Sequence, residues 1–420
     1  MKILLLNYTD ASGGGAANAV FRLTQSLNER GISATLGVVE KKTSSEYVIS
    51  CKRKHKNLFL KLFHKMLHFY YSLFKKNIFF KTTNNIFHSF NYLSLIDINW
   101  INSSDFDVVH IHWIHNNMLS IKDISKIQKP IVWTTHDSWI CCGAEHHPNI
   151  LENDSRYING YSKKNKPLTT KGIDICKKIW LKKKKYLNKK NITFIAPSNW
   201  QSDIIKKSLL FRHNKVYVIP NIVNSMDFYP KNKKEIKHMF EIPTDKKIIG
   251  FGAAYGLREK KSMKGTEYLL QLLRKIDNPE NYFLIIFGPV EDNFIKNISI
   301  PFFATGYIFN QKILASIYNL CDVIINPSLI ENLPYICLES IKCGIPVVAF
   351  DVGGTKDIIE HKKTGYLATP YNVEELLEGL NYCFQNSNCL LQNCLEKSNK
   401  DFNLDKIIEK HIDVYKSVML

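Results

Sequence analysis

Residues 321–346 read CDVIINPSLIENLPYICLESIKCGIP, a short apolar run that Pro327 closes and a second segment whose first turn suits Pro334. This pattern predicts a buried strand and then a helix, with Glu331 in the connecting loop and Glu339 inside the helix. Because helical side chains lean toward the N-terminus, Glu339 can point back to the loop, where free backbone N–H groups also gather. The junction therefore offers two hydroxyl acceptors beside an anion site, which suits a hydroxyl-rich ligand. The alternative is that both carboxylates are solvated and are favoured only by the helix dipole.

Short β-rich runs alternate with helical segments along the chain, which is the α/β pattern of doubly wound parallel sheets. The expected strands are 3–6, 34–39, 108–112, 131–135, 193–196, 216–219, 248–252, 283–287, 323–325 and 347–350. With 420 residues the chain exceeds one core. The Pro and Asn residues within 218–230 are typical of a link between two sheets. We therefore expect two domains, residues 1–205 and 215–400, and a C-terminal helix, 401–420, that can pack back on the first domain.

The positive charge of the chain is concentrated in its first half. Residues 1–200 contain 30 Lys and Arg against 13 Asp and Glu, so they carry +17 of the net charge of +19. Residues 163–190 alone contain twelve lysines. Since no nucleic-acid-binding motif accompanies them, we expect no nucleic acid and favour an anionic membrane surface or a phosphorylated lipid as partner. A merely solvated lysine-rich surface is the alternative.

The cellular location is predicted from features that bear on membranes and redox state. Residues 57–80 have lysines at helical spacing beside a broad apolar face, which predicts a basic amphipathic helix that either lies on a membrane or faces a protein core. No apolar run is long enough to span a bilayer, and residues 1–8 predict a strand rather than a signal peptide. The ten cysteines include no C-x-x-C pair, so we expect reduced thiols. We therefore expect a cytoplasmic protein, peripheral on the inner face of the cell membrane.

A glycine-rich loop, with Gly13, Gly14 and Gly15, follows the first expected strand and precedes an apolar-periodic helix. Glycines let a ligand approach the backbone closely at a helix N-terminus. The loop is not G-x-G-x-x-G, and no acidic residue is placed to bind a ribose, so a nicotinamide enzyme is disfavoured. A plain turn is the alternative.

Histidines occur at the ends of two expected strands, where open α/β sheets place ligand groups. His136 lies one residue past its strand and could donate a hydrogen bond to a sugar hydroxyl. His110 and His112 share one strand face and are assigned to packing or to support of the site. A metal-binding histidine cluster is the rival hypothesis, but no carboxylate or cysteine with ligand spacing is evident, so we expect no metal site.

A cationic loop lies between the expected strand 248–252 and the helix that follows it. Arg258, Lys260, Lys261 and Lys264 match a diphosphate, because Arg gives a bidentate contact and Lys a compact charge. Lys264 is the first choice, since Gly265 beside it permits close approach. For Lys260 and Lys261, solvated surface lysines are the alternative.

The order of these motifs resembles that of the retaining glycosyltransferases of family 4, which have the GT-B fold, an α/β arrangement of two Rossmann-like doubly wound domains facing across a cleft. The likeness covers nearly the whole chain. It rests on Gly13–Gly15, His136-Asp137, Ala196-Pro-Ser-Asn-Trp200, Val218-Ile-Pro-Asn221, Lys264-Gly265, Glu331-x7-Glu339, Gly353-Gly354 and Thr364-Gly365. Within the family, the His136–Trp139 and Pro197–Trp200 contexts are similar to enzymes that build capsule, exopolysaccharide or lipopolysaccharide chains.

The resemblance implies that the second domain binds a UDP- or GDP-linked sugar and the first an acceptor, with no cofactor and no metal. Glu331, His136 and Lys264 would be the catalytic residues. Donor binding would fall to Gly14, Gly15, Arg258, Lys264, Asn332, Leu333 and Glu339, with Glu339 on the ribose hydroxyls. The family usually has an Arg directly after the glycine that ends the second domain's first strand; Ala253 stands there, and Arg258 is the expected substitute.

Three functions remain open on the sequence. The first is sugar transfer, with retention, to a lipid-linked or growing surface saccharide. The second is an epimerase or hydrolase that acts on a nucleotide sugar without an acceptor. The third is a non-catalytic basic adaptor at an anionic membrane, which would leave Glu331, Glu339 and Lys264 without a role.

Overall fold

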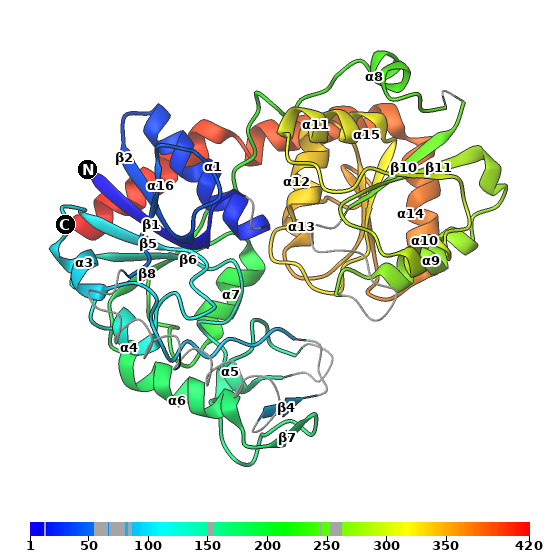
Figure 1. Ribbon diagram of the computed structural model, residues 1–420. Coiled ribbons are helices and arrows are strands. Elements are labelled where there is room, and N and C mark those ends of the chain that lie inside the picture. Colours follow the sequence, from blue (N-terminus) through cyan, green and yellow to red (C-terminus); the bar gives the residue numbers. More distant parts are fainter. Residues whose placement is uncertain are drawn as a thin grey trace. The chain divides into compact units, whose positions relative to one another are not determined.

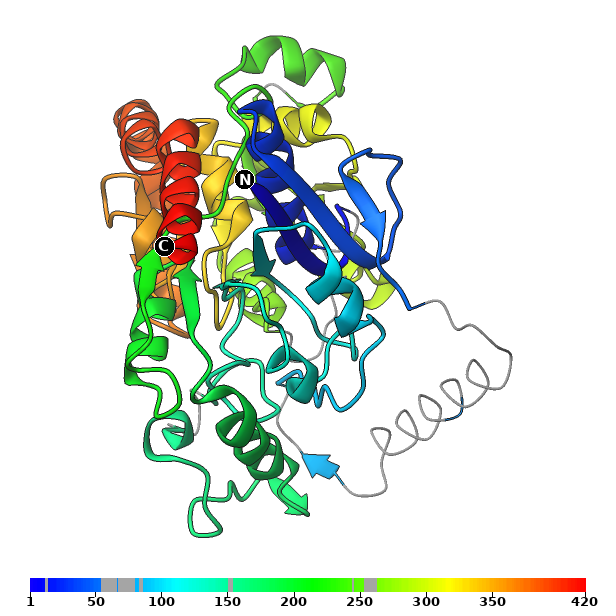
Figure 2. The same cartoon turned by 90° about the vertical axis from the view of Figure 1, so that its left-hand side faces the viewer.

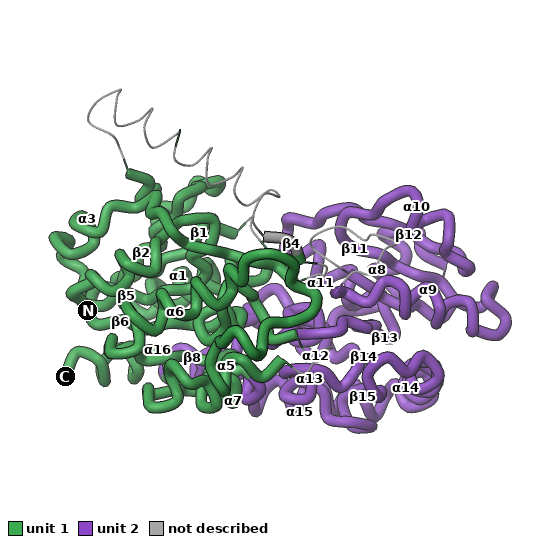
Figure 3. Tube along the Cα trace, turned by 90° about the horizontal axis from the view of Figure 1, so that it is seen from below, with its two compact units in different colours: residues 1–197, 201–219, 410–420 green, residues 198–200, 220–409 purple. Residues whose placement is uncertain are grey.

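The computed structural model of the chain describes residues 1–11, 14–53, 66, 80–82, 86–149, 154–243, 245–252 and 263–420. The described chain forms two compact units, coloured separately in Figure 3. The first contains residues 1–197, 201–219 and 410–420, and the second contains 198–200 and 220–409. The predicted helix within 57–80, apart from residues 66 and 80, lies outside the described residues, as do Gly13, Ala253, Arg258, Lys260 and Lys261.

The first unit is built on a seven-stranded sheet of order β3-β2-β1-β5-β6-β8-β9, whose neighbours all pair in parallel. Figure 1 labels β1, β2, β5, β6 and β8 among these strands. The strands are β1 (Lys2–Thr9), β2 (Ser33–Glu40), β3 (Val48–Ser50), β5 (Val108–Ile111), β6 (Ile131–Thr134), β8 (Ile192–Ala196) and β9 (Val216–Val218). The helices are α1 (Gly15–Glu29), α3 (Ile98–Ser103), α4 (Ile121–Ile124), α5 (Arg156–Asn159) and α6 (Ile175–Leu187), together with α7 (Asn199–Lys207) from residue 201 on and α16 (Leu404–Met419) from residue 410 on. A separate antiparallel pair joins β4 (Phe80–Thr82) to β7 (Thr170–Gly172).

The second unit has a six-stranded parallel sheet of order β12-β11-β10-β13-β14-β15. The strands are β10 (Lys247–Gly252), β11 (Tyr282–Phe287), β12 (Phe302–Ala304), β13 (Val323–Asn326), β14 (Val347–Phe350) and β15 (Gly365–Ala368). The helices are α8 (Lys233–Met239), α9 (Thr266–Arg274), η3 (Pro279–Asn281), α10 (Asp292–Ile295), α11 (Gln311–Leu320), α12 (Tyr335–Lys342), α13 (Thr355–Ile358), α14 (Val373–Gln385) and α15 (Ser387–Asp401).

The central strands β5, β6, β13 and β14 are buried along their whole length and mostly apolar, because both faces of each sheet are covered at its middle. In β13, Val323 and Ile325 join a core with residues of α9 and α14, while Ile324 joins the opposite core with residues of α11 and α12. This alternation follows from the two-residue period of a strand. The predicted fold class is confirmed, and all ten predicted strands are present.

Each sheet changes winding direction next to its first strand, and ligands of doubly wound folds bind beyond the carboxyl ends of strands at such a point. In the second unit this point lies between β10 and β13, and in the first between β1 and β5. The predicted site residues follow these strands or their neighbours. The topology therefore places them where the fold favours ligands.

The C-terminal helix α16 (red in Figure 2) contributes its last part to the first unit. The hydroxyl of Tyr415, on α16, lies 2.7 Å from Nδ1 of His110, on β5, and both side chains are buried. Residues 198–200 belong to the second unit, where the Ser198 hydroxyl donates to Asn332 Oδ1 at 2.7 Å.

All ten cysteines are free thiols, and Cys389 is the exposed one among them. Among the described residues, no helix combines the length and the apolar character needed to cross a bilayer.

Candidate functional site

An ion pair marks the switch point of the second unit. Lys264 lies in the segment that leads from β10 to α9, and Glu331 lies in the loop between β13 and α12. Because β10 and β13 are paired neighbours, their following loops meet, and Lys264 Nζ is 2.5 Å from Glu331 Oε1. The Glu331 side chain is 12% exposed and that of Lys264 is 44% exposed, so the carboxylate is the sheltered partner. Two of the three predicted catalytic residues are therefore in contact.

The backbone at Glu331 packs against two glycines at which any side chain would force the backbone to shift. The N–H of Gly354 donates to the Glu331 carbonyl at 3.0 Å. Gly353 has φ +56°, and a Cβ there would lie 1.8 Å from the same carbonyl oxygen. A Cβ on Gly354 would lie 1.9 Å from the carbonyl oxygen of Asn332. The sequence motif Gly353-Gly354 thus clamps the loop that carries Glu331.

Asn332 and Leu333, predicted to bind the donor, lie within the same loop and are buried. The amide oxygen of Asn332 accepts the Ser198 hydroxyl. The Leu333 carbonyl accepts from Asn221 Nδ2 at 3.3 Å. These contacts hold the loop in place. They also explain why the motifs around Ser198 and Asn221 accompany the Glu331 motif in the sequence.

Gly265 has the left-handed conformation, with φ +69°, at the N-cap of α9. A Cβ on Gly265 would lie 1.8 Å from the carbonyl oxygen of Pro327. The close approach that the sequence suggested for a ligand is therefore made by the protein backbone. The glycine lets the start of α9 pack against the end of β13, which brings Lys264 to Glu331.

Glu339 lies inside α12, as predicted, and is buried. Its Oε2 accepts a hydrogen bond from the Tyr318 hydroxyl at 3.0 Å. Burial, with the nearby Glu339 carboxylate, raises the pKa of Tyr318 well above its usual value, so the phenol stays protonated and donates. Glu339, which was expected to point back to the loop between β13 and α12, therefore has a protein partner on one of its two carboxylate oxygens.

In the first unit, Gly14 and Gly15 lie where β1 gives way to α1. Gly14 is the N-cap of α1 and has φ +88°, which favours glycine. Its carbonyl accepts the first helical hydrogen bond, from Asn18 N at 2.9 Å. Gly15 begins the helix and is exposed. The pair forms the N-terminus of a fifteen-residue helix at the switch point.

His136 follows β6 and is partly exposed. Its Nε2 lies 2.9 Å from Nδ1 of His112, and burial lowers the pKa of His136 to about 4, so the ring is neutral near pH 7. His110 contacts Tyr415 with Nδ1 and the Thr134 hydroxyl, at 2.8 Å, with Nε2. Both ring nitrogens of His110 are thus hydrogen-bonded within the protein core, whereas His112 contacts His136.

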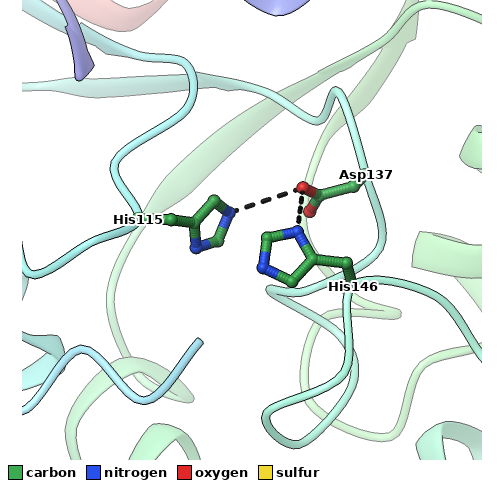
Figure 4. A group of neighbouring side chains, drawn as sticks. All are labelled: His115, Asp137 and His146. Carbon is green, nitrogen blue, oxygen red and sulfur yellow. Dashed lines mark hydrogen bonds and ion pairs between the residues drawn. The ribbon is translucent and has the colours of Figure 1, made fainter. Parts of the chain in front are cut away.

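A cluster not predicted from the sequence contains His115, Asp137 and His146 (Figure 4), and Asp137 is the residue after His136. Asp137 Oδ2 is 2.7 Å from His146 Nδ1 and 3.4 Å from His115 Nε2. The two histidines keep the pKa of Asp137 well below its usual value, against the effect of burial. The sequence interpretation found no carboxylate near the histidines; Asp137 is that carboxylate. Its position directly after His136, at a strand end, was the available signal.

Two family descriptions together cover most of the chain. Residues 13–226 match Glycosyltransferase Family 4, and residues 232–401 match Glycosyl transferases group 1. The first match alone extends over half of the chain.

Curated relatives are similar at moderate identity. A glycosyltransferase of Haemophilus influenzae is 29% identical over 49% of this chain and 57% of its own length. A 41.2 kDa protein in the cps region of Klebsiella pneumoniae is 25% identical over 82% of this chain and 87% of its own length. The chain spans only 57% of the length of the Haemophilus relative and 55% of the length of a relative from Methanocaldococcus jannaschii.

Solved structures share the fold over the whole chain. Sucrose-phosphate synthase from Thermosynechococcus elongatus has a TM-score of 0.66 at 15% identity, with 100% of this chain and 99% of that chain covered. Anabaena HepE in complex with UDP and glucose has a TM-score of 0.62 at 15% identity, covering 99% and 100%. With its two parallel doubly wound sheets, the chain has the GT-B fold and belongs to glycosyltransferase family 4.

Proposed function

We propose that the protein is a retaining, metal-independent glycosyltransferase that moves a sugar from a UDP- or GDP-linked donor to a lipid-linked or growing surface-saccharide acceptor. Family membership supports the reaction class. The cps-region relative supports a role in surface polysaccharide synthesis. A further relative, 22% identical over 53% of this chain and 59% of its own length, is a UDP-Gal:alpha-D-GlcNAc-diphosphoundecaprenol alpha-1,3-galactosyltransferase of Escherichia coli. That name supports a lipid-linked acceptor.

The observation that carries the proposal is the Lys264–Glu331 pair. A half-exposed lysine and a sheltered carboxylate meet at the switch point, beside the N-termini of α9 and α12. In the proposed donor complex, Lys264 leaves Glu331 for the diphosphate, and Glu331 then accepts hydrogen bonds from sugar hydroxyls. The helix N-termini add partial positive charge near the phosphates. Arg258 is proposed as the second phosphate contact, and Glu339 as the group that binds the ribose.

The proposed chemistry follows from charge development. When the sugar–phosphate bond breaks, positive charge grows on the anomeric carbon and negative charge on the leaving diphosphate, which Lys264 stabilises. The acceptor oxygen attacks on the face of the departing phosphate, whose oxygen takes the acceptor proton, so the anomeric configuration is retained. His136, whose Nε2 lies 2.9 Å from His112 Nδ1, is proposed to donate a hydrogen bond to a sugar hydroxyl. Gly14 and Gly15 let a sugar or phosphate group approach the start of α1.

The test is a transfer assay with purified protein, a panel of UDP- and GDP-sugars, and membrane lipid extracts or oligosaccharides as acceptors. We expect acceptor-dependent nucleotide release, unchanged by a chelator, and a product with the donor's anomeric configuration by NMR. Full turnover of the donor alone, to an isomer or to free sugar, would favour an epimerase or hydrolase instead. Binding to liposomes without affinity for any nucleotide sugar would favour the adaptor hypothesis.

We further propose that the lysine-rich surface of the first unit docks on an anionic bilayer at the cytoplasmic face of the cell membrane. The surface comprises residues 163–169, β7 and α6. These parts lie together at one end of this unit (Figures 1 and 2). Three apolar side chains stand among its lysines, with Leu168 98%, Ile173 40% and Leu181 44% exposed. Apolar side chains exposed among cations suit insertion between anionic headgroups.

Vesicle sedimentation tests this docking surface. Leu168→Asp is expected to weaken binding to phosphatidylglycerol vesicles several-fold, whereas Met239→Asp, at a similarly exposed position in the second unit (76%), should leave it unchanged. Equal binding by wild type and by the Leu168 variant would contradict the role of Leu168 as an anchor.

A further inference from the structure

Three chain segments bring two imidazoles and one carboxylate together in the first unit. His115 follows β5, Asp137 follows β6, and His146 lies in the loop beyond (Figure 4). The three ligand atoms all lie within 4.8 Å of one another. His115 and His146 are buried, and the Asp137 side chain is 13% exposed. The group is therefore sheltered, with Asp137 as its most accessible member.

The donor set and its spacing fit one divalent transition-metal ion. Imidazole nitrogen and carboxylate oxygen are standard ligands of zinc-class ions. Ligand atoms bound tetrahedrally at about 2.0–2.2 Å lie roughly 3.3 Å apart. The distance from Asp137 Oδ2 to His115 Nε2, 3.4 Å, already has this value. The distance to His146 Nδ1, 2.7 Å, is a hydrogen bond and would have to lengthen by about half an ångström as its proton leaves.

For His146 and Asp137, the atom that does not face the ion is held by a hydrogen bond. The other nitrogen of His146, Nε2, lies 2.9 Å from the Ser89 hydroxyl. The other oxygen of Asp137, Oδ1, accepts the Trp139 N–H at 3.0 Å. The His115 ring packs edge-on against the Trp139 ring, with centroids 4.9 Å apart. Such outer contacts orient metal ligands and raise their basicity.

The protons can be rearranged without a net change. Without an ion, His146 donates its Nδ1 proton to Asp137 and its Nε2 accepts from Ser89. With an ion, His146 adopts the other tautomer, in which Nδ1 offers its lone pair and Nε2–H donates to Ser89. A hydroxyl can take either role, so Ser89 supports both states. His115 also carries its proton on Nδ1 when the ion is bound, so that Nε2 offers its lone pair to the ion.

We propose that His115 Nε2, Asp137 Oδ2 and His146 Nδ1 bind one zinc-class divalent ion, with a fourth position left for water. The ion would tie the loop from Asp137 to His146 to the segment after β5, without taking part in transfer. The ion would not bind the diphosphate, which Lys264 contacts in the proposed donor complex. Sugar transfer would therefore need no metal ion.

The experiment uses full-length, untagged protein, stripped with a chelator, dialysed and titrated with Co²⁺ while d–d absorption is recorded. We expect one ion per chain, a spectrum of nitrogen and oxygen ligands, and displacement by Zn²⁺. Asp137→Asn keeps the size of the side chain but removes its charge, and should abolish the stoichiometric spectrum. Ser89→Ala should weaken binding about 10–100-fold, as loss of an outer contact does.

The control is His213→Ala, which removes an exposed histidine of the same unit and should bind like wild type. Circular dichroism and nucleotide-sugar affinity report whether each variant is folded. Absence of stoichiometric Co²⁺ binding in wild type would overturn the proposal, and so would an unchanged spectrum in folded Asp137→Asn. The cluster would then be a hydrogen-bonded structural triad. The readout is spectroscopic, so it stands even if the proposed transfer reaction fails.

Discussion

Lys264 Nζ lies 2.5 Å from Glu331 Oε1, and the two residues are 67 positions apart in the chain. They meet because β10 and β13 are neighbours in the sheet, so the loops that follow these strands share one edge. In the absence of donor, each charge neutralises the other. Binding a diphosphate and a sugar at this pair replaces one set of charge contacts with another.

Loss of either partner of this pair should affect turnover more than stability. Glu331→Gln keeps the shape but removes the charge, and Lys264→Ala removes the phosphate cation. We expect each to lower kcat/KM by about 10²–10³-fold, as loss of one electrostatic contact in a transition state does. Nucleotide release with acceptor present is the measurement. The matched control is Lys275→Ala, which breaks the exposed pair with Glu374 (2.9 Å) in the same unit and should be neutral. Unchanged turnover in both site variants would contradict the proposed roles.

Glu339 should govern donor affinity rather than rate. Because the Tyr318 hydroxyl fixes one oxygen of Glu339, Tyr318→Phe should leave the carboxylate less well oriented. We expect it to cost about 1–2 kcal/mol in the free energy of unfolding and to raise the Kd for the nucleotide sugar several-fold. Glu339→Gln should raise Kd further with a smaller effect on kcat. Calorimetric titration and steady-state kinetics separate the two quantities. An equal loss of kcat in Glu331→Gln and Glu339→Gln would argue against this division of roles.

Two glycines with the same backbone conformation allow two costs of a Gly→Ala substitution to be measured separately. One is the strain of the left-handed backbone, and the other is the steric clash of the new Cβ. Gly265 and Gly306 have φ +69° and +68°, but a Cβ meets the Pro327 carbonyl only at Gly265, while at Gly306 it meets nothing within 4 Å. Gly306→Ala should cost about 1 kcal/mol in unfolding free energy, the price of the left-handed conformation. Gly265→Ala should cost at least about 2 kcal/mol more, because backbone must move. It should also weaken donor binding, since the displaced loop carries Lys264. Urea unfolding and nucleotide-sugar titration give both values, and equal costs at the two sites would show that the collision is relieved.

The central strands could be predicted from the sequence, but several edge strands could not. A strand such as β13 is buried on both faces and flanked by paired neighbours, so its first three residues, Val323–Ile325, form a continuous apolar run. The strands β3, β12 and β15 lie at sheet edges and have three or four residues each. In β12, for example, no residue is fully buried. Runs of three or four residues are too short to show a periodic signal that separates them from loops.

The site shows the same contrast. Lys264, Glu331 and His136 could be singled out because each follows a recognisable strand. The His115–Asp137–His146 group could not, because it depends on how the loop after Asp137 folds back. The backbone N–H of Ser138 donates to the His146 carbonyl at 2.8 Å, and this contact brings His146 to Asp137. A loop that folds back in this way follows neither helical nor strand spacing. The number of residues between Asp137 and His146 therefore does not indicate that their side chains meet.

The buried Lys183 predicts a pH dependence of stability. Lys183, on α6, is 0% exposed, and its ammonium group donates to the carbonyls of Trp139, Cys142 (3.1 Å) and Gly143 (2.7 Å). Burial lowers its pKa to about 7 from a usual value of 10.5. Between these values the unfolded chain binds the proton and the folded chain does not. The free energy of unfolding should therefore rise with pH across this window, by at most about 1.4 kcal/mol per pH unit, and the effect should vanish below pH 7.

Comparison with Lys183→Met isolates this contribution, since groups that do not interact with Lys183 titrate equally in both proteins, and the pKa values of the interacting groups Cys141, about 12, and His146, about 4, lie outside the range from pH 7 to 9. The variant removes the donor from three carbonyls and should be less stable than wild type by about 2–4 kcal/mol at pH 7. Its deficit should grow as the pH rises to 9, because only wild type gains from losing the proton. Lys184→Met, at the exposed neighbouring position, should follow the wild-type curve. A deficit that stays constant between pH 7 and 9 would mean that the carbonyls, together with the Trp139 ring 3.5 Å from the ammonium nitrogen, keep Lys183 charged. In that case the three hydrogen bonds outweigh the cost of burial.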